Sequence, residues 1–271
     1  MTRFVCPDCK GELVQLNCAH CNHQYASDGG FASLLTRAPA FSGAQALVDV
    51  YDQIYSEHSG VWVNQGRTPA FIDYFSQLVA RYAPKTLLEI GCGEGVLLRA
   101  LRAERKWATD LASSALAKTA SGTAAELCIA LGESLPFPDQ GFDVVVSVGV
   151  MEHFVDDLAA SREILRVTRA GGHYIVLIHI HLTVWQSIGQ KIAEYVFPRP
   201  RPIALAKWIK GKFYKRIDQP IQNPYTIASV QQILERAGFK VQEVIHRGSH
   251  PQAPLIGPHV IIYVCEKPAG A

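Results

Sequence analysis

Apolar residues along the chain recur at two spacings, one typical of helices and the other of buried strands. Helical spacing runs through 44–58 and 69–83, and the second of these segments begins at Thr68-Pro69, a frequent helix start. Short apolar runs without alternation lie at 87–90 and 144–148, and such runs are typical of strands buried on both faces of a parallel sheet. Helices and strands alternating in this way predict an α/β fold with a doubly wound sheet.

The pattern continues to the C-terminus, with one long interruption. A strand is predicted at 174–178, a helix at 227–237, and two closing strands near 241–245 and 259–265. The segment 181–225 is far longer than the roughly 2–6 residues usual for connections in α/β proteins. Aromatic and basic side chains are interspersed with prolines in this segment, and this composition predicts an ordered insertion that caps the ligand-binding edge of the sheet. A solvated helical hairpin is the alternative.

A glycine-rich turn follows the strand at 87–90 and precedes a predicted helix at 96–101. Gly91, Gly93 and Gly95 leave the backbone open to a ligand, and the helix start presents free amides to a negative group. The spacing is G-x-G-x-G with Glu89 two places earlier. It therefore differs from the G-x-G-x-x-G fingerprint of dehydrogenases, the competing interpretation.

The glycine turn resembles the cofactor-binding motif of class I S-adenosylmethionine (AdoMet) methyltransferases. The stretch 132–137, Gly-Glu-Ser-Leu-Pro-Phe, followed by Phe142-Asp143, resembles a signature of the branch that methylates quinones and small molecules. The resemblance implies a seven-stranded doubly wound sheet over 68–271. It also implies a cofactor-binding set of Glu89, Gly91, Cys92, Gly93, Gly95, Asp110, Leu111, Leu131, Gly132, Glu133, Ser147 and Val148.

Two positions of this set carry specific expectations. Asp110 ends the predicted second strand, where a carboxylate can accept both ribose hydroxyls of an adenosine; it can also cap the helix that follows from Ser113. Leu131 stands where the family has an adenine-binding aspartate, so that side-chain bond is expected to be absent. Backbone groups at Leu131 and Gly132 could still reach the ring, and Glu133 is a weaker candidate.

Three histidines are candidates for a catalytic base. His179 and His181 stand where the strand at 174–178 ends, and ligands of open α/β sheets bind outside the carboxyl ends of the strands. An imidazole there is suited to accept a proton near neutral pH. His153, after the strand at 144–148, is the reserve. For all three, a structural histidine is the alternative.

Four of the seven cysteines form two C-x-x-C knuckles near the N-terminus, Cys6, Cys9, Cys18 and Cys21. Four thiolates at this spacing predict one tetrahedral zinc ion, and disulfides are the alternative. The segment 1–38 resembles the zinc ribbon that precedes some bacterial methyltransferases and the ribbon of a tRNA-methyltransferase activator. Because four cysteines leave no open position on the metal, a structural or docking role is expected. Residues 39–67 are interpreted as a linker with a helix that could act as a lid.

The composition bears mainly on the substrate. The net charge is only +2, whereas RNA enzymes usually carry a strong basic field. We therefore predict O- or N-methylation of a small, largely apolar metabolite. An rRNA or tRNA base methyltransferase and a non-catalytic module that binds the cofactor or a partner are the alternatives. No apolar run approaches the roughly 18 residues of a membrane span, and no signal-peptide core is seen, so a cytoplasmic enzyme is expected.

Overall fold

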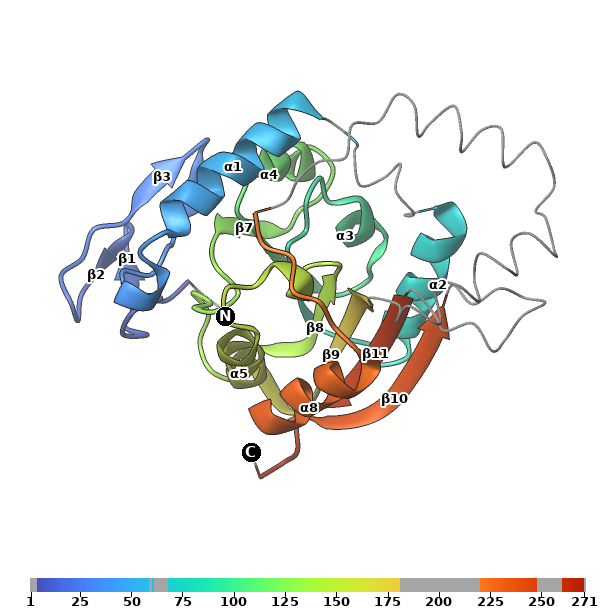
Figure 1. The fold of residues 1–271 in the computed structure, drawn as a ribbon. Coiled ribbons are helices and arrows are strands. Elements are labelled where there is room, and N and C mark those ends of the chain that lie inside the picture. Colours follow the sequence, from blue (N-terminus) through green and yellow to red (C-terminus); the bar gives the residue numbers. More distant parts are fainter. Residues whose placement is uncertain (1–3, 59, 61–67, 181–219, 248–259, 271) are drawn as a thin grey trace.

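The computed structural model describes residues 4–58, 60, 68–180, 220–247 and 260–270. The predicted cap at 181–225 therefore lies largely outside the described residues, as does His181. Within the described part, the chain forms a nine-stranded mixed sheet covered by helices (Figure 1).

The sheet has the order β10-β11-β9-β8-β5-β6-β7-β4-β3. Seven of its strands are those expected of the family, and they run as β5 (Thr86–Ile90), β6 (Arg105–Asp110), β7 (Glu126–Ile129), β8 (Phe142–Val148), β9 (Thr168–His179), β10 (Lys240–Arg247) and β11 (Val260–Glu266). The strands from β9 to β7 are parallel to one another, while β11 pairs antiparallel with both β9 and β10. The α/β fold with its doubly wound sheet is thus confirmed.

Successive residues of the central strands face different cores, which is why their apolar runs show no alternation. Leu88 and Val145 join the core beneath α5 (Asp157–Val167) and α8 (Ile227–Ala237). Leu87, Val144 and Val146 join the opposite core, beneath α2 (Pro69–Ala80), α3 (Val96–Ala100) and α4 (Ser113–Ala120). Burial on both faces gives the three-layer arrangement seen in Figure 1.

The N-terminal segment extends this sheet. Its hairpin of β3 (Ala26–Asp28) and β4 (Phe31–Ser33) places β4 parallel to β7, with Ala32 paired to Cys128. The short β1 (Leu13–Val14) and β2 (Asn17–Cys18) form a separate two-stranded ribbon beside it. Cys6, Tyr25 and Leu34 are buried in the same core as α5 and α8. The cysteine-rich segment therefore packs as part of the domain's core.

A short 3-10 helix (η1, Pro39–Phe41) leads into α1 (Ala44–Glu57), which lies across α4 at the top of Figure 1. Asp52 of α1 caps α4 from outside, because its Oδ1 accepts hydrogen bonds from the Ser114 amide at 2.8 Å and from the Ser113 hydroxyl at 3.1 Å. Helix α4 has no side-chain cap of its own. The helix that was predicted as a lid is therefore hydrogen-bonded to the start of α4.

None of the helices that the structure describes is both long and apolar enough to cross a membrane.

Candidate active site

The glycine turn joins β5 to α3 at the carboxyl edge of the sheet. Gly91, Gly93 and Gly95 all have positive φ, at 66°, 52° and 71°, a backbone conformation that favours glycine. The amides of Gly91 and Cys92 both donate to the Thr109 carbonyl of β6, at 2.8 and 3.0 Å. These bonds fix the turn between the ends of β5 and β6.

Glycine is also required at this turn by its neighbours. A Cβ on Gly91 would stand 2.4 Å from Cγ2 of Val150, and one on Gly93 would stand 2.6 Å from the hydroxyl of Tyr55. Tyr55 belongs to α1 and is buried. Helix α1, which the sequence predicted as a lid, therefore contacts the glycine turn.

Asp110 links this turn to the next element. Its Oδ2 accepts the Gly93 amide at 2.7 Å, and its Oδ1 accepts the Ala112 amide at 3.0 Å, just before α4. The side chain ends β6 and is almost fully buried. Each oxygen of a carboxylate has two lone pairs and can accept more than one hydrogen bond. The predicted bonds of Asp110 to ribose hydroxyls stay a prediction.

The loop after β7 contains the three positions assigned to the adenine side. Leu131 is buried, and a Cβ on Gly132 would stand 2.4 Å from the Phe154 ring. Glu133 accepts the Val155 amide at 2.6 Å, so its carboxylate holds the segment that leads into α5. Burial raises the pKa of Glu133, against the opposing effect of the backbone amides that it accepts.

The remaining predicted cofactor residues line the same edge but differ in accessibility. Cys92 and Ser147 are fully buried, and the Ser147 hydroxyl is hydrogen-bonded to the Tyr174 hydroxyl at 2.8 Å. Glu89 and Val148 are also buried, while Leu111 is half-buried.

Of the two candidate bases that the structure describes, His179 is the one that contacts a carboxylate. Its Nδ1 lies 2.9 Å from Oε1 of Glu152, which also accepts the His179 backbone amide. His153 instead contacts the Ile221 carbonyl through Nδ1 at 2.6 Å, which ties η3 (Met151–His153) to the end of the insertion. Sequence reasoning missed Glu152, because only the parallel pairing of β8 with β9 brings residues 152 and 179 together.

The four knuckle cysteines converge as predicted. Their sulfur atoms all lie within 4.8 Å of one another, with Cys9–Cys18 at 3.4 Å and Cys6–Cys21 at 3.7 Å. A tetrahedral ion with Zn–S bonds of about 2.3 Å needs sulfurs about 3.8 Å apart, so the donor set fits zinc. All seven cysteines are free thiols, and the structure contains none of the disulfides considered as the alternative.

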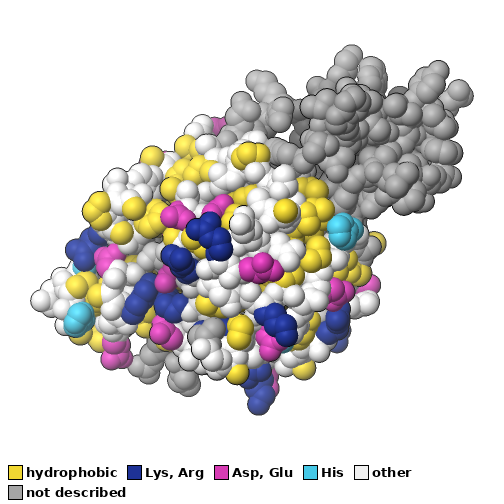
Figure 2. Space-filling model, turned by 60° about the horizontal axis from the view of Figure 1, so that its bottom comes forward, with side chains coloured by type: hydrophobic (Ala, Val, Ile, Leu, Met, Phe, Trp, Pro, Cys, Tyr) yellow, Lys and Arg dark blue, Asp and Glu magenta, His cyan; other side chains and the backbone are white. Residues whose placement is uncertain are grey.

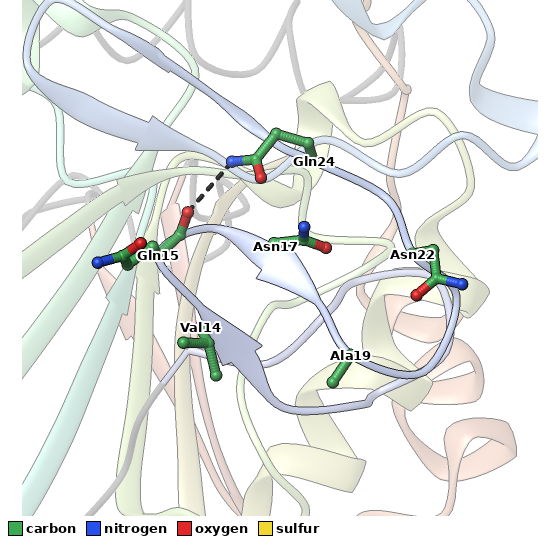
Figure 3. A pocket seen from close by; sticks show the side chains of 6 residues that line it. All are labelled: Val14, Gln15, Asn17, Ala19, Asn22 and Gln24. Carbon is green, nitrogen blue, oxygen red and sulfur yellow. Dashed lines mark hydrogen bonds between the residues drawn. The ribbon is translucent and has the colours of Figure 1, made fainter.

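A hollow on the ribbon is lined by Asn17, Ala19 and Asn22, the chain neighbours of Cys18 and Cys21. Figure 3 shows its polar lining, in which the Gln24 side-chain amide donates to the Gln15 carbonyl at 3.1 Å. Val14 also lines the hollow. None of the predicted site residues lines it.

Comparisons with known proteins agree with the fold and the glycine turn. Residues 88–176 match the family described as a methyltransferase domain. Ajmaline N-methyltransferase of Rauvolfia serpentina is 32% identical over 110 residues, which cover 36% of this chain and 37% of that protein. A Bos taurus protein described as a probable tRNA methyltransferase 9B is 28% identical over 120 residues, which cover 39% of this chain and 26% of that protein.

Among solved structures, a chain from the complex of the Haloferax volcanii Trm112 methyltransferase activator with a methyltransferase has a TM-score of 0.56. The match covers 82% of this chain and 97% of that chain at 15% identity, so it concerns the fold alone. Both of these curated relatives are matched over less than two-fifths of their own length.

Proposed function

We propose that this chain, which contains a class I AdoMet-dependent methyltransferase domain, O- or N-methylates a small, largely apolar metabolite. The observation that carries the proposal is the position of Asp110. Its carboxylate bridges the glycine turn and the start of α4 at the carboxyl edge of the sheet, where ligands of open α/β sheets bind. AdoMet supplies an activated methyl group when bound, and the protein's task is to hold the acceptor in line with it.

In this proposal each group of residues around the turn contacts a different part of the cofactor. Gly91, Gly93 and Gly95 let the backbone approach the cofactor, and Asp110 accepts its ribose hydroxyls. Leu131 and Gly132 flank the adenine through backbone groups and apolar contact. Helix α1 covers the turn through Tyr55 and excludes water. Holding both reactants in position in this way can supply about 7–11 kcal/mol of a barrier.

The mixture of positive and negative charges on the described surface supports a small-molecule acceptor over RNA. Lys and Arg side chains stand beside Asp and Glu side chains on the face in Figure 2. Ion pairs of the described residues include Arg81 with Glu243 at 3.0 Å and Arg105 with Glu126 at 2.6 Å. RNA-binding enzymes need unpaired positive charge over an extended surface. The described part of the chain offers little support for such a surface.

RNA is the second candidate, on two grounds. A relative is described as a probable tRNA methyltransferase, and four-cysteine ribbons are compact enough to dock a partner or a nucleic acid. In this case 181–225, with its many basic residues, would contact RNA. A non-catalytic module is the third reading.

Two measurements together separate the three candidates. Calorimetry with AdoMet and S-adenosylhomocysteine tests the cofactor, and transfer of labelled methyl groups into separated metabolite, RNA and protein fractions tests the acceptor. We expect binding of both ligands and label in the metabolite fraction. Label confined to RNA would overturn the metabolite, and binding without any transfer would favour the non-catalytic module.

We further propose that Cys6, Cys9, Cys18 and Cys21 hold one zinc ion with a structural role. Zinc binding to such sites contributes about 10–16 kcal/mol of apparent folding free energy. The first knuckle rests on the loop at 131–137, because the Val5 amide donates to the Pro136 carbonyl at 2.9 Å and the Ser134 hydroxyl donates to the Pro7 carbonyl at 2.8 Å. The ion would thereby support the loop assigned to the adenine side.

A further inference from the structure

We infer that Glu152 positions His179 as the proton acceptor for a substrate hydroxyl, so that this enzyme is an O-methyltransferase. The inference rests on the proposed function and narrows it to one acceptor chemistry. It depends on the contacts between two residues at the carboxyl ends of neighbouring strands.

Glu152 fixes the orientation of the His179 ring. Its Oε1 lies 2.9 Å from Nδ1 and also accepts the backbone amide of the same residue. An ionised carboxylate only accepts hydrogen bonds, so Nδ1 must carry the ring proton. In the neutral ring the other nitrogen, Nε2, is then unprotonated and available as a base.

The pair is buried at one end and accessible at the other. The Glu152 side chain is 9% exposed and that of His179 is 64% exposed. The ring lies over Gly149, where a Cβ would stand 3.1 Å from Cε1 of His179. Gly149 directly follows β8. A base at this place can meet an acceptor that arrives beyond the ends of β8 and β9.

Two buried polar atoms beside the pair point to a ligand. Among the described residues, Oε2 of Glu152 and the hydroxyl of Tyr51 have no hydrogen-bond partner. Buried polar atoms in folded proteins nearly always have one. Tyr51 comes from α1, and its ring lies 6.4 Å from that of His153. The titratable groups around the pair include His153 and three tyrosines, Tyr51, Tyr174 and Tyr225, on whose pKa values the charge of Glu152 acts. The charge of Asp110, at the end of β6, also acts on the pKa of Tyr51.

The chemistry of the acceptor explains why a base matters. An amine attacks with a lone pair that it already has, and it can lose its proton to water afterwards. A hydroxyl is a weak nucleophile until its proton leaves. Here the hydroxyl proton goes to Nε2 of His179 while the oxygen forms its bond to the methyl carbon. The sulfur–methyl bond breaks and its electron pair stays on sulfur, which becomes an uncharged thioether. Glu152 balances the positive charge left on the imidazole.

The first test needs no substrate. Two-bond 15N–1H correlation spectra of the full chain labelled in histidine report the tautomer of each ring, and the His179→Asn variant identifies the signal. We expect the Nδ1–H tautomer in the wild type and a shift toward Nε2–H in Glu152→Ala. A wild-type ring already in the Nε2–H form would overturn the inference. Glu152→Gln, which keeps the volume, is the second variant in case Glu152→Ala does not fold.

The second test uses labelled AdoMet with a panel of phenols and the matching anilines. We expect transfer to phenols, with kcat reduced by about 100-fold or more in His179→Asn and by about tenfold or more in Glu152→Gln. AdoMet affinity should be unchanged in both, and imidazole added to His179→Ala should restore part of the rate. His173→Ala, six residues earlier on the same strand and with its ring against Tyr82, is the matched control.

The outcomes separate the two proposals. Failure of the wild type to bind AdoMet would count against the methyltransferase itself. Normal AdoMet binding with transfer to anilines alone, or with rates insensitive to both substitutions, would refute the pair while leaving the methyltransferase intact.

Discussion

The hydroxyl oxygen of Tyr55 lies 2.6 Å from the point at which a Cβ on Gly93 would stand. This contact joins a helix that precedes the central domain to the turn between β5 and α3. A second contact holds α1 in this position. Lys118 of α4 donates to the Tyr55 carbonyl at 3.2 Å and also pairs with Glu94, within the glycine turn, at 2.8 Å. The glycine turn and helix α1 therefore form one packed unit.

We first predict that Gly93→Ala weakens AdoMet binding by about tenfold or more, which corresponds to about 1.4 kcal/mol. The new methyl group would displace the Tyr55 hydroxyl and shift the turn. Tyr55→Phe in the same chain removes that oxygen and should restore part of the affinity. Calorimetry with S-adenosylhomocysteine measures both.

The matched control for this substitution is Gly171→Ala. Gly171 has a similar φ of 69°, but a Cβ there would meet nothing within 4 Å. The Gly171→Ala variant should lose about 1–2 kcal/mol of stability from backbone strain, with no loss of affinity for S-adenosylhomocysteine. Equal affinity losses in both variants would show that the Tyr55 contact does not matter.

The second prediction concerns Asp110. Asp110→Asn keeps one acceptor oxygen but loses the charge that strengthens the bonds to the Gly93 and Ala112 amides. Bonds to charged groups contribute about 1.5–3 kcal/mol, so we expect a similar loss of stability together with weaker AdoMet binding. Asp49→Asn, at an exposed position of α1, should change stability by less than about 0.5 kcal/mol. Undiminished affinity in Asp110→Asn would remove Asp110 from the cofactor site.

Third, removal of the metal should loosen the loop at 131–137 as well as the ribbon. Elemental analysis should find one zinc per chain. After chelation, amide exchange should rise in 4–25 and in 131–137, and AdoMet affinity should fall by about fivefold or more, the lower end of typical coupling between sites. Exchange that rises in the ribbon alone would mean that the contacts of Val5 and Ser134 carry no coupling.

The fourth prediction is a pH dependence centred on Glu163. This carboxylate accepts Lys10 of the ribbon at 2.9 Å, the Leu135 amide at 2.9 Å and Arg166 at 2.7 Å. Burial raises its pKa, but the bonds and charges of Arg166 and Lys10 outweigh burial, so the pKa of Glu163 is lowered from 4.5. The resulting stabilisation is fully present above the unfolded pKa and is lost as the pH falls through the folded pKa.

Glu163→Gln should therefore cost about 1–3 kcal/mol of unfolding free energy at pH 7, and the difference from the wild type should shrink below about pH 4.5. Denaturant titrations at several pH values measure this difference. Loss of metal at acid pH affects both chains alike and cancels from the comparison. Glu126→Gln breaks an exposed pair with Arg105 and should cost no more than about 1 kcal/mol at any pH. A pH-independent difference for Glu163→Gln would contradict the assignment.

The central sheet could be predicted from sequence because its strands are buried on both faces and leave a clear apolar signal. The glycine turn could be found because its spacing reflects backbone conformations that few other residues adopt, as the φ values of Gly91, Gly93 and Gly95 confirm. The convergence of four cysteines followed from their spacing alone. Capping fixes where the helices begin: α5 begins at Asp157, because Asp156 caps it through the Ala159 amide.

What escaped prediction depends on contacts between distant parts of the chain. Glu152 looks like an ordinary turn residue until β8 and β9 pair, and nothing near Asp52 indicates that it caps α4, since Ser114 lies 62 residues further on. The two extra strands were missed for a related reason. β3 and β4 have three residues each, too few for a periodic pattern, and β4 becomes a strand only by pairing with β7.

That pairing has a consequence for how the protein avoids self-association. Without β4, the strand β7 would end the sheet and present a row of unpaired backbone groups, a ready template for another chain. The hairpin moves the free edge outward to β3, which is only three residues long and ends in Asp28. A short edge strand that ends in a charge pairs poorly with strands of other molecules. The cysteine-rich segment thus also protects the sheet from aggregation, at the end opposite β10.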